Sequence, residues 1–347
     1  MTATMTGAYL PGGRRVELRR VPVPTPGRGQ VLLRVRASTI CGSDLRAIYR
    51  EHLGHGPEAY RDVVAGHEPA GEVVEVGPDA GSLRPGDRVA VYHISGCGVC
   101  ADCRMGYQIS CSAPDRAAYG WQRDGGHAEY LLAQARDCIR LPDFLSYLDG
   151  ACCACGFGTA YEALCRLAPS GRDQMLVVGT GPVGMAAGLL ARCLGVAHRV
   201  GVDTSPERLA LARRLGAIDE GVLAEHATPA GLRDATGGGF ETAVDCSGST
   251  AGRALAVRSA RRYGRCVLVG EGGRLELDAS PDVIHQQLRI EGSWVVSTWR
   301  LQELVDNLAR WRLHPEVVVT GRYPLDEAAA AYADADAGAS GKVGIVT

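Results

Sequence analysis

The 347-residue chain has a formal net charge of −2, with 46% hydrophobic and 22% charged residues, an ordinary globular composition for about two domains. It has no basic stripe or block of like charge, which argues against nucleic acid as a partner, and no apolar run near the ~20 residues of a membrane-spanning helix. The N-terminus lacks the charged start and apolar stretch of a signal peptide, so we expect a cytoplasmic protein whose thirteen cysteines are thiols or metal ligands rather than disulfides.

The first 150 residues are rich in short strand patterns separated by Pro and Gly. Apolar residues alternate, or valines run together, at 31–39, 70–77 and 86–92. Beyond about residue 174, strands and helices alternate instead. The expected elements there are strands at 175–179, 198–203, 241–246, 265–270 and 288–294 and helices at 182–195, 206–217 and 299–313, with β-like pieces at 317–323 and 341–347. A β-rich domain therefore precedes an α/β domain built from βαβ units around a parallel sheet.

A glycine-rich segment, GTGPVG, joins one of these strands to the helix that follows it. In that context GxGxxG predicts dinucleotide binding. The first glycine allows a tight turn, the second lets the backbone approach a pyrophosphate at the helix N-terminus, and the third allows close helix–strand packing. The candidate cofactor-binding residues of this segment are Gly179, Gly181, Pro182, Val183 and Gly184.

Asp203 ends the next predicted strand and is placed to accept hydrogen bonds from both hydroxyls of the adenosine ribose. A carboxylate there would repel a 2′-phosphate, so NAD is favoured over NADP. The competing interpretations are a glycine-rich loop that only packs, or a methyltransferase that binds an adenosyl group on a similar fold.

Four cysteines are crowded into the segment GCGVCADCRMGYQISC. The spacing C-x2-C-x2-C-x7-C places four soft ligands in one loop, enough for a closed tetrahedral shell around zinc. A closed shell indicates a structural zinc site, and four unrelated thiols are the alternative. The predicted ligands are Cys97, Cys100, Cys103 and Cys111.

Further ligand-type residues occur in three other places. The tetrapeptide CGSD at 41–44 follows a strand, GHE at 66–68 precedes another, and three cysteines lie in the segment 149–163. Each is weak evidence alone, since a lone cysteine is usually a small core residue. Together they supply three protein ligands and leave a fourth position open, as a catalytic zinc site requires.

Six motifs, taken in order, resemble those of the zinc-dependent alcohol dehydrogenases of the medium-chain dehydrogenase/reductase superfamily. This family includes polyol, threonine and secondary-alcohol dehydrogenases. The motifs are C-G-S-D, G-H-E-x-x-G, G-D-R-V, the four-cysteine lobe, G-T-G-P-V-G and the closing G-K-V. The resemblance covers nearly the whole chain and implies an α/β fold. Residues 1–153 are expected to form a GroES-like β-rich catalytic domain with a zinc lobe at 93–115, and residues 299–347 return to this domain and complete it. Residues 154–298 are expected to form a Rossmann NAD-binding domain with a doubly wound parallel sheet. It also implies two zinc ions per chain, NAD, a small alcohol or ketone substrate and a homodimer or homotetramer.

By the same resemblance Cys41 and His67 bind the catalytic zinc. Glu68 is a nearby carboxylate that can replace the water on the metal. Asp44 orients His67 by hydrogen bonding and fixes its tautomer.

The third ligand of the catalytic zinc separates the branches of the family, since polyol dehydrogenases typically carry glutamate there and many alcohol dehydrogenases carry cysteine. The stretch ACGFGTAY resembles the second group, which makes Cys155 the expected ligand and places Thr159 against the nicotinamide. Cys152 and Cys153 remain the competing thiols.

The proton released by the alcohol needs a route out of the site. Ser43 matches the relay hydroxyl of the family, but Arg46 stands where many relatives carry the outer histidine, and a guanidinium is not a base at ordinary pH. Arg46 could hold the cofactor instead, or the proton could pass directly to water.

His93 precedes the zinc lobe much as a histidine does near the substrate of threonine dehydrogenases, although the spacing differs by one residue. We expect it to serve as an acid/base in the substrate pocket, with a structural histidine as the alternative. Arg208 matches the cation beside the adenosine ribose in NAD-using relatives.

Zinc would polarise the substrate oxygen and NAD would accept the hydride, so the expected activity is oxidation of a hydroxyl group, most simply of a secondary alcohol. The polar loop 49–63 and the 5% aromatic content favour a polyol, sugar, cyclitol or amino-alcohol, whereas Cys155 favours general primary or secondary alcohol dehydrogenases. A threonine-dehydrogenase-like enzyme is a further alternative. A zinc-free reductase of the same superfamily and a non-catalytic NAD-binding structural or sensor protein are the competing classes.

Lysine occurs only once in the chain, at Lys342, while arginine is abundant. Because arginine replaces lysine everywhere rather than at selected positions, we attribute this usage to codon bias. No functional role for Lys342 follows from it.

Overall fold

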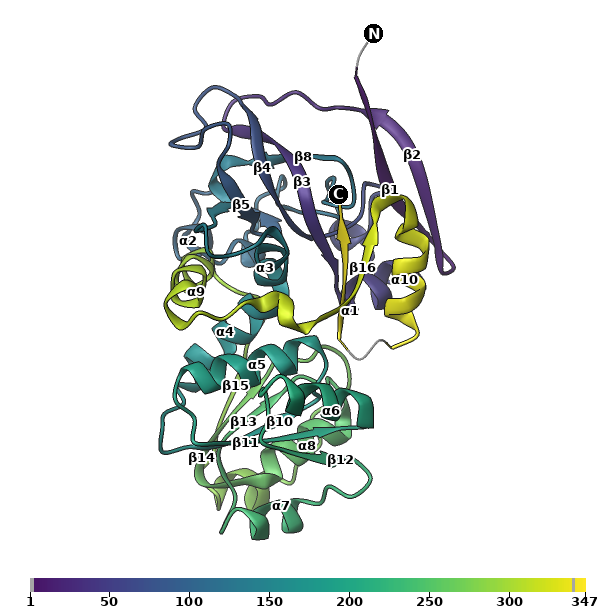
Figure 1. Cartoon of the computed structure of the whole chain (residues 1–347). Coiled ribbons are helices and arrows are strands. Elements are labelled where there is room, and N and C mark those ends of the chain that lie inside the picture. The colour runs from purple at the N-terminus through teal and green to yellow at the C-terminus, as the bar shows by residue number, and fades with distance from the viewer. Residues whose placement is uncertain (1–2, 339–340) are drawn as a thin grey trace. The chain divides into compact units, whose positions relative to one another are not determined.

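The computed structural model describes residues 3–338 and 341–347. The chain divides into two compact units (Figure 1). The first comprises Met1–Gly158 together with Val296–Thr347, and the second comprises Thr159–Val295. The predicted domain bounds of 153/154 and 298/299 remain predictions. No helix in the described part of the chain is long and apolar enough to cross a membrane.

The first unit is built around a seven-stranded sheet. Its order is β16-β17-β3-β4-β5-β9, and β8 also pairs with β3. The strands are β3 (Gln30–Ile40), β4 (Glu68–Val76), β5 (Arg88–Val91), β8 (Tyr130–Gln134), β9 (Cys138–Arg140), β16 (Val319–Pro324) and β17 (Lys342–Val346). The last strand of the chain therefore lies beside β3, which is antiparallel to it with Val343 opposite Ile40. This pairing places the C-terminal strand beside the strand that leads directly into Cys41.

Two smaller hairpins complete the sheets of this unit. β1 (Thr4–Gly12) pairs with β2 (Arg15–Pro22), and β6 (Ile94–Ser95) pairs with β7 (Ala117–Ala118). The helices of the unit are α1 (Gly42–Asp44), α2 (Ala101–Arg104), α3 (Tyr147–Cys152), α9 (Thr298–Trp311) and α10 (Ala328–Asp336). Helix α3 packs on β3, β4 and β5, and α10 packs on β16 and β17 (Figure 1).

The second unit holds a six-stranded parallel sheet in the order β12-β11-β10-β13-β14-β15. Its strands are β10 (Gln174–Val178), β11 (His198–Asp203), β12 (Glu220–Leu223), β13 (Phe240–Asp245), β14 (Ala260–Leu268) and β15 (Arg289–Gly292). Numbered within the unit, the strands run 3-2-1-4-5-6, the order of a doubly wound dinucleotide-binding sheet. The predicted fold class, a β-rich domain with a Rossmann domain, is confirmed.

Helices join these strands and bury their apolar faces on the sheet. They are α4 (Gly158–Leu167), which leads into the unit, then α5 (Pro182–Cys193), α6 (Pro206–Arg214), α7 (Pro229–Ala235) and α8 (Thr250–Ser259). Helix α5 packs on β10 and β13, and α6 packs on β11 and β12. The central strands β10, β11 and β13 are mostly apolar and buried, as parallel strands covered on both faces must be, whereas the edge strands β12 and β15 are partly exposed.

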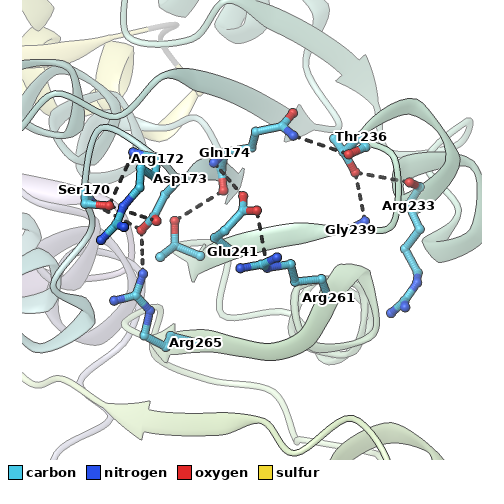
Figure 2. Close-up of polar contacts among 11 residues, drawn as sticks. Ser170, Arg172, Asp173, Gln174, Arg233, Thr236, Gly239, Glu241, Arg261 and Arg265 are labelled. Carbon is cyan, nitrogen blue, oxygen red and sulfur yellow. Dashed lines mark hydrogen bonds and ion pairs between the residues drawn. The ribbon is translucent and has the colours of Figure 1, made fainter.

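Polar side chains fix the starts of β10 and β13 (Figure 2). Asp173 accepts a hydrogen bond from Arg265, and Glu241 accepts one from the backbone N–H of Gln174 at 2.7 Å. Arg261 pairs with Glu241 at 3.3 Å. The network lies at the amino end of these strands, opposite the carboxyl end where the glycine-rich turn follows β10. We therefore regard it as structural.

Candidate active site

Four potential ligands of a metal ion meet at the end of β3. One ligand atom from each of Cys41, His67, Glu68 and Cys155 lies within 4.8 Å of the others. The two thiol sulfurs are 4.0 Å apart, close to the separation of about 3.8 Å that two thiolates have on a tetrahedral zinc ion with ordinary Zn–S bonds. The donor set of soft sulfur, imidazole and carboxylate fits zinc.

Cys41 follows β3 directly and begins the turn into α1. Its backbone N–H donates to the carboxylate of Asp44 at 3.0 Å, which closes the turn CGSD on itself. A hydrogen bond from the Cys155 thiol lowers the pKa of Cys41 well below the ordinary value. The pair therefore releases a proton readily when a thiolate binds a cation.

Cys155 lies in a wide helical turn, Cys153–Phe157, that continues α3. Such π-type turns in helices are frequent at functional sites, because they shift the direction of a single side chain. Of the three cysteines proposed from the sequence, the structure brings Cys155 to Cys41. Cys152 and Cys153 are fully buried, and neither belongs to the group of four.

His67 is oriented by a buried carboxylate. Its Nδ1 lies 2.7 Å from Oδ1 of Asp44, and both side chains are almost completely buried. This contact leaves Nε2 as the ring atom available to a metal. Burial alone would lower the pKa of His67, but the Asp44 carboxylate outweighs burial and holds that pKa well above the ordinary value.

Glu68 is fully buried and receives a lysine ammonium. The Nζ atom of Lys342 lies 2.7 and 2.9 Å from the two carboxylate oxygens of Glu68, and the hydroxyl of Thr39 donates to the same carboxylate. Burial raises the pKa of Glu68 to about 7 against the opposing effect of Lys342. The only lysine of the chain is thus part of the site, a role that the sequence did not indicate.

His93 is placed beside His67, with the ring centroids 5.6 Å apart. Its Nδ1 lies 2.8 Å from the carbonyl oxygen of Ala154, so Nε2 is the ring atom left for a substrate. Burial lowers the pKa of His93 to about 4, and the ring is therefore neutral at physiological pH. The predicted acid/base role stays a prediction, but a neutral ring of this kind is better suited to hydrogen bonding than to accepting a proton.

The other residues considered for the proton route and the substrate pocket do not belong to the group of candidate metal ligands. Ser43 is partly buried in α1, and Arg46 is exposed. Nε2 of His52 lies 2.9 Å from the carbonyl oxygen of Leu10, and the indole N–H of Trp121 donates to the carbonyl of Glu58. These contacts fix the polar loop 49–63 against the body of the first unit.

The four-cysteine lobe brings its thiols together as the spacing predicts. One sulfur from each of the four cysteines lies within 4.8 Å of the others. Backbone N–H groups point at the sulfurs, for example Cys100 N–H to Cys97 Sγ at 3.4 Å. Hydrogen bonds from the N–H groups of Val99 and Cys100 lower the pKa of Cys97 to about 6. Gly98 adopts a φ of +78° in the turn, a conformation that favours glycine.

The glycine-rich segment has the geometry of a dinucleotide loop. Gly179 has a φ of +86°, and a Cβ on Gly184 would lie 1.9 Å from the carbonyl oxygen of Gly179, so only glycine fits there. Gly181 is the N-cap of α5, and Pro182 and Val183 form the first turn of that helix. The N-terminus of α5 thus directly follows the glycine turn, and a helix N-terminus of this kind favours an anion.

Asp203 is buried at the end of β11. Its Oδ2 accepts a hydrogen bond from Thr180 N–H at 2.6 Å, and its Oδ1 accepts one from Ser205 N–H at 2.9 Å. Arg208 lies in the helix that follows, and its Nε is buried without a hydrogen-bond partner among the described residues. A buried donor of this kind fits a cofactor that supplies the missing acceptor. Thr159 opens the second unit within α4.

His127 is a buried histidine that the sequence analysis passed over. It is fully buried, neither ring nitrogen has a hydrogen-bond partner in the described part of the chain, and burial lowers its pKa to about 4. Its ring lies edge-on to Tyr332, with centroids 5.6 Å apart. A Cβ on Gly66 would lie 2.4 Å from its Nδ1, so glycine before His67 is what makes room for the ring. A signal existed in the sequence, namely a histidine flanked by small residues in the run GGHA.

Comparisons with known proteins agree with this geometry. The alcohol dehydrogenase GroES-like domain matches residues 27–143, and the zinc-binding dehydrogenase domain matches residues 182–310. The chain is 50% identical over 345 residues, 98% of each chain, to the uncharacterized zinc-type alcohol dehydrogenase-like protein YphC of Escherichia coli (strain K12). It is 33% identical to an L-threonine 3-dehydrogenase of Streptomyces coelicolor over 94% of each chain. Its fold matches that of the alcohol dehydrogenase TADH from Thermus sp. ATN1 with a TM-score of 0.88 and 28% identity over 99% of each chain.

The chain therefore belongs to the zinc-dependent alcohol dehydrogenases of the medium-chain dehydrogenase/reductase superfamily. It is an oxidoreductase that acts on CH–OH donors, with zinc and NAD as cofactors. These predictions from the motifs are confirmed. A zinc-free reductase and a non-catalytic NAD-binding protein do not fit a member of this family that carries a full set of candidate zinc ligands.

Proposed function

We propose that the protein oxidises a secondary hydroxyl group of a polyol, sugar, cyclitol or amino-alcohol to the ketone. The hydride passes to NAD⁺, and one proton is released. The observation that carries the proposal is the group of Cys41, His67, Glu68 and Cys155, which pairs a complete zinc ligand set with a carboxylate held by Lys342. Zinc, when bound, supplies Lewis-acid polarisation of the substrate oxygen, and NAD accepts the hydride.

The side chains of this chain hold and orient the reactants. Cys41, His67 and Cys155 are the proposed catalytic zinc ligands, and Asp44 fixes the tautomer of His67 through its 2.7 Å contact. Ser43, two residues after Cys41, is the proposed hydroxyl that passes the released proton toward solvent. For the structural zinc we propose Cys97, Cys100, Cys103 and Cys111 as ligands.

The cofactor is proposed to bind along the carboxyl end of the second unit's sheet. The helix N-terminus after Gly181 receives the pyrophosphate, and Asp203 with Arg208 flanks the adenosine ribose. A carboxylate at Asp203 repels a 2′-phosphate, which supports the use of NAD. Thr159 is the proposed contact to the nicotinamide.

The polar loop 49–63 supports a hydrophilic substrate. A second candidate is a threonine-dehydrogenase-like activity, and the identity to an L-threonine 3-dehydrogenase favours it. A general alcohol dehydrogenase is the third, supported by a cysteine at position 155. We also propose a cytoplasmic homodimer or homotetramer.

The test is the absorbance of reduced nicotinamide on adding NAD⁺ and a panel of substrates to the zinc-loaded protein. The panel contains polyols, sugars, cyclitols, amino sugars, threonine and simple primary and secondary alcohols, and zinc content is measured in parallel. Turnover of a polar secondary alcohol with two zinc ions per chain is the expected result. Turnover of simple aliphatic alcohols alone would reject the polar substrate, and a single zinc with no turnover would reject the catalytic site.

A further inference from the structure

Thr180 is a fully buried threonine between two glycines of the turn that follows β10. Its backbone N–H donates to Oδ2 of Asp203 at 2.6 Å, and its hydroxyl donates to the same oxygen at 3.2 Å. Asp203 ends β11, the strand that pairs with β10 in the sheet of the second unit (Figure 1). One side chain of the glycine-rich turn therefore holds the carboxylate that is proposed to bind the adenosine ribose.

The methyl group of Thr180 is fixed by a missing side chain on β11. Gly201 precedes Asp203 by two residues, so both positions face the same side of the strand. A Cβ on Gly201 would lie 2.8 Å from Cγ2 of Thr180, a separation too short for any other residue at that position. A threonine has a stiff χ1 angle. A methyl group seated against Gly201 therefore directs the hydroxyl toward Asp203.

The second oxygen of the Asp203 carboxylate is held as well. Oδ1 accepts a hydrogen bond from the backbone N–H of Ser205 at 2.9 Å, and only 7% of Asp203 is exposed. Three protein donors thus fix the carboxylate in one orientation. A carboxylate that turned away would leave both donors of Thr180 buried without this acceptor, which is costly.

The rejection of NADP depends on that fixed orientation. A 2′-phosphate on the adenosine ribose would be placed against the Asp203 carboxylate, and two anions in contact repel each other. NADP therefore binds only if the carboxylate rotates away from the phosphate. Any contact that prevents this rotation increases the preference for NAD.

We propose that Thr180 determines the cofactor specificity of this enzyme by locking the Asp203 carboxylate in the orientation that binds the adenosine ribose and repels a 2′-phosphate. The proposal rests on the proposed role of Asp203 and adds the residue that gives the carboxylate its position. Because it acts through Asp203, Thr180 is a positioning residue. The hydride transfer itself is unchanged.

The test measures the dissociation constants of NADH and NADPH by calorimetry on the zinc-loaded protein, without an alcohol substrate. Thr180→Val replaces the hydroxyl by a methyl group of similar size, and Thr180→Ser keeps the hydroxyl but loses the methyl group. The control is Thr242→Val. Thr242 is fully buried in β13 of the same sheet, and its hydroxyl donates to the carbonyl oxygen of Gln174, where β10 begins, at 3.4 Å.

We expect the wild type to bind NADH more tightly than NADPH. Thr180→Val should lower this preference about five- to tenfold, through weaker binding of NADH and stronger binding of NADPH, as expected for the loss of one hydrogen bond to a charged group. Thr180→Ser should keep the preference within about threefold of the wild-type value, because it retains the donor. Thr242→Val should leave the preference unchanged. Equal weakening of NADH and NADPH by Thr180→Val would show a purely structural role and overturn the proposal.

A double variant tests whether Thr180 acts through Asp203. In the background Asp203→Ala, Thr180→Val should change either dissociation constant by less than about twofold, because the carboxylate that Thr180 positions is gone. A full effect of Thr180→Val in that background would show that Thr180 acts by another route, and the proposal would be rejected.

The same measurements separate this proposal from the proposed function. A wild type that binds NADPH as tightly as NADH would remove Asp203 from ribose recognition, and the role of Thr180 would be rejected with it. A wild type that prefers NADH, with the same preference in Thr180→Val, would reject the role of Thr180 alone. Thr180→Ala, which also removes the hydroxyl, gives the same comparison if Thr180→Val does not fold.

Discussion

His127 makes a prediction that can be worked through numerically. Burial lowers its pKa to about 4 from the ordinary 6.5, so the folded protein holds this ring neutral at pH values where the unfolded chain would protonate it. A depressed histidine pKa stabilises the folded state fully above pH 6.5, and that contribution is lost as pH falls toward 4. Between pH 7.5 and pH 5, the loss from this one site is about 2 kcal/mol of unfolding free energy.

The variant His127→Phe keeps a ring against Tyr332 and removes the titrating group. Urea unfolding at a series of pH values, with excess zinc throughout, gives the difference in stability between variant and wild type. That difference should shift in favour of the variant by about 2 kcal/mol between pH 7.5 and pH 5. The control, His226→Gln, removes a histidine whose side chain is 71% exposed and should leave the pH dependence unchanged. Parallel stability curves for His127→Phe and wild type would show that His127 is not held neutral, and the reasoning from burial would fail.

Three further predictions concern the metal and cofactor sites. Elemental analysis of Cys155→Ser should find one zinc ion per chain, and this variant should be inactive. Cys152→Ser should retain both ions. The opposite pattern would make Cys152 the ligand. Lys342→Met leaves Glu68 buried without its cation and should destabilise the protein by about 3–5 kcal/mol in urea unfolding. The double variant Lys342→Met/Glu68→Gln should recover much of that loss, and an additive double variant would disprove the coupling. Asp203→Gly should shift the ratio of kcat/KM for NADP over NAD by about tenfold or more toward NADP, and an unchanged ratio would remove Asp203 from ribose recognition.

Much of the second unit could be predicted from the sequence because its signals are local. The strand expected at 198–203 is β11, and the helix expected from residue 182 is α5. The glycine-rich turn could be recognised because steric demands on Gly179 and Gly184 allow no other residue. Such features depend only on neighbours along the chain.

Other elements left weaker signals. Helix α10 lies in the stretch DEAAAAYADADAG, which has few large apolar residues to mark a buried face, and the sequence predicts only β-like pieces at that end of the chain. The hairpin of β1 and β2 was not singled out either, and its outer strand is largely exposed. In both cases the partner surface, rather than the local pattern, determines the element.

The contacts that surround the ligand set were the least predictable part of the site. Lys342 reaches Glu68 only because β17 pairs with β3, and codon bias was therefore a reasonable but incomplete interpretation of a single lysine. The burial of His127 depends on a glycine that lies far from it in the sequence. Motifs identify the atoms that bind a metal, whereas long-range pairing decides their electrostatic surroundings.

The pairing of β17 with β3 also has a consequence for how the protein is made. Residues that form β3 and the first ligand are synthesised before the unit Thr159–Val295, whereas Lys342 is synthesised after it. The unit Thr159–Val295 is contiguous in sequence and can fold while the first unit still lacks its final strand. Until then residues 37–40 of β3 lack their partner strand and Glu68 has no cation beside it, a state open to aggregation and to chaperones. Ribosomes that stall before β17 would thus release chains whose nucleotide-binding fold is complete but whose catalytic centre is not.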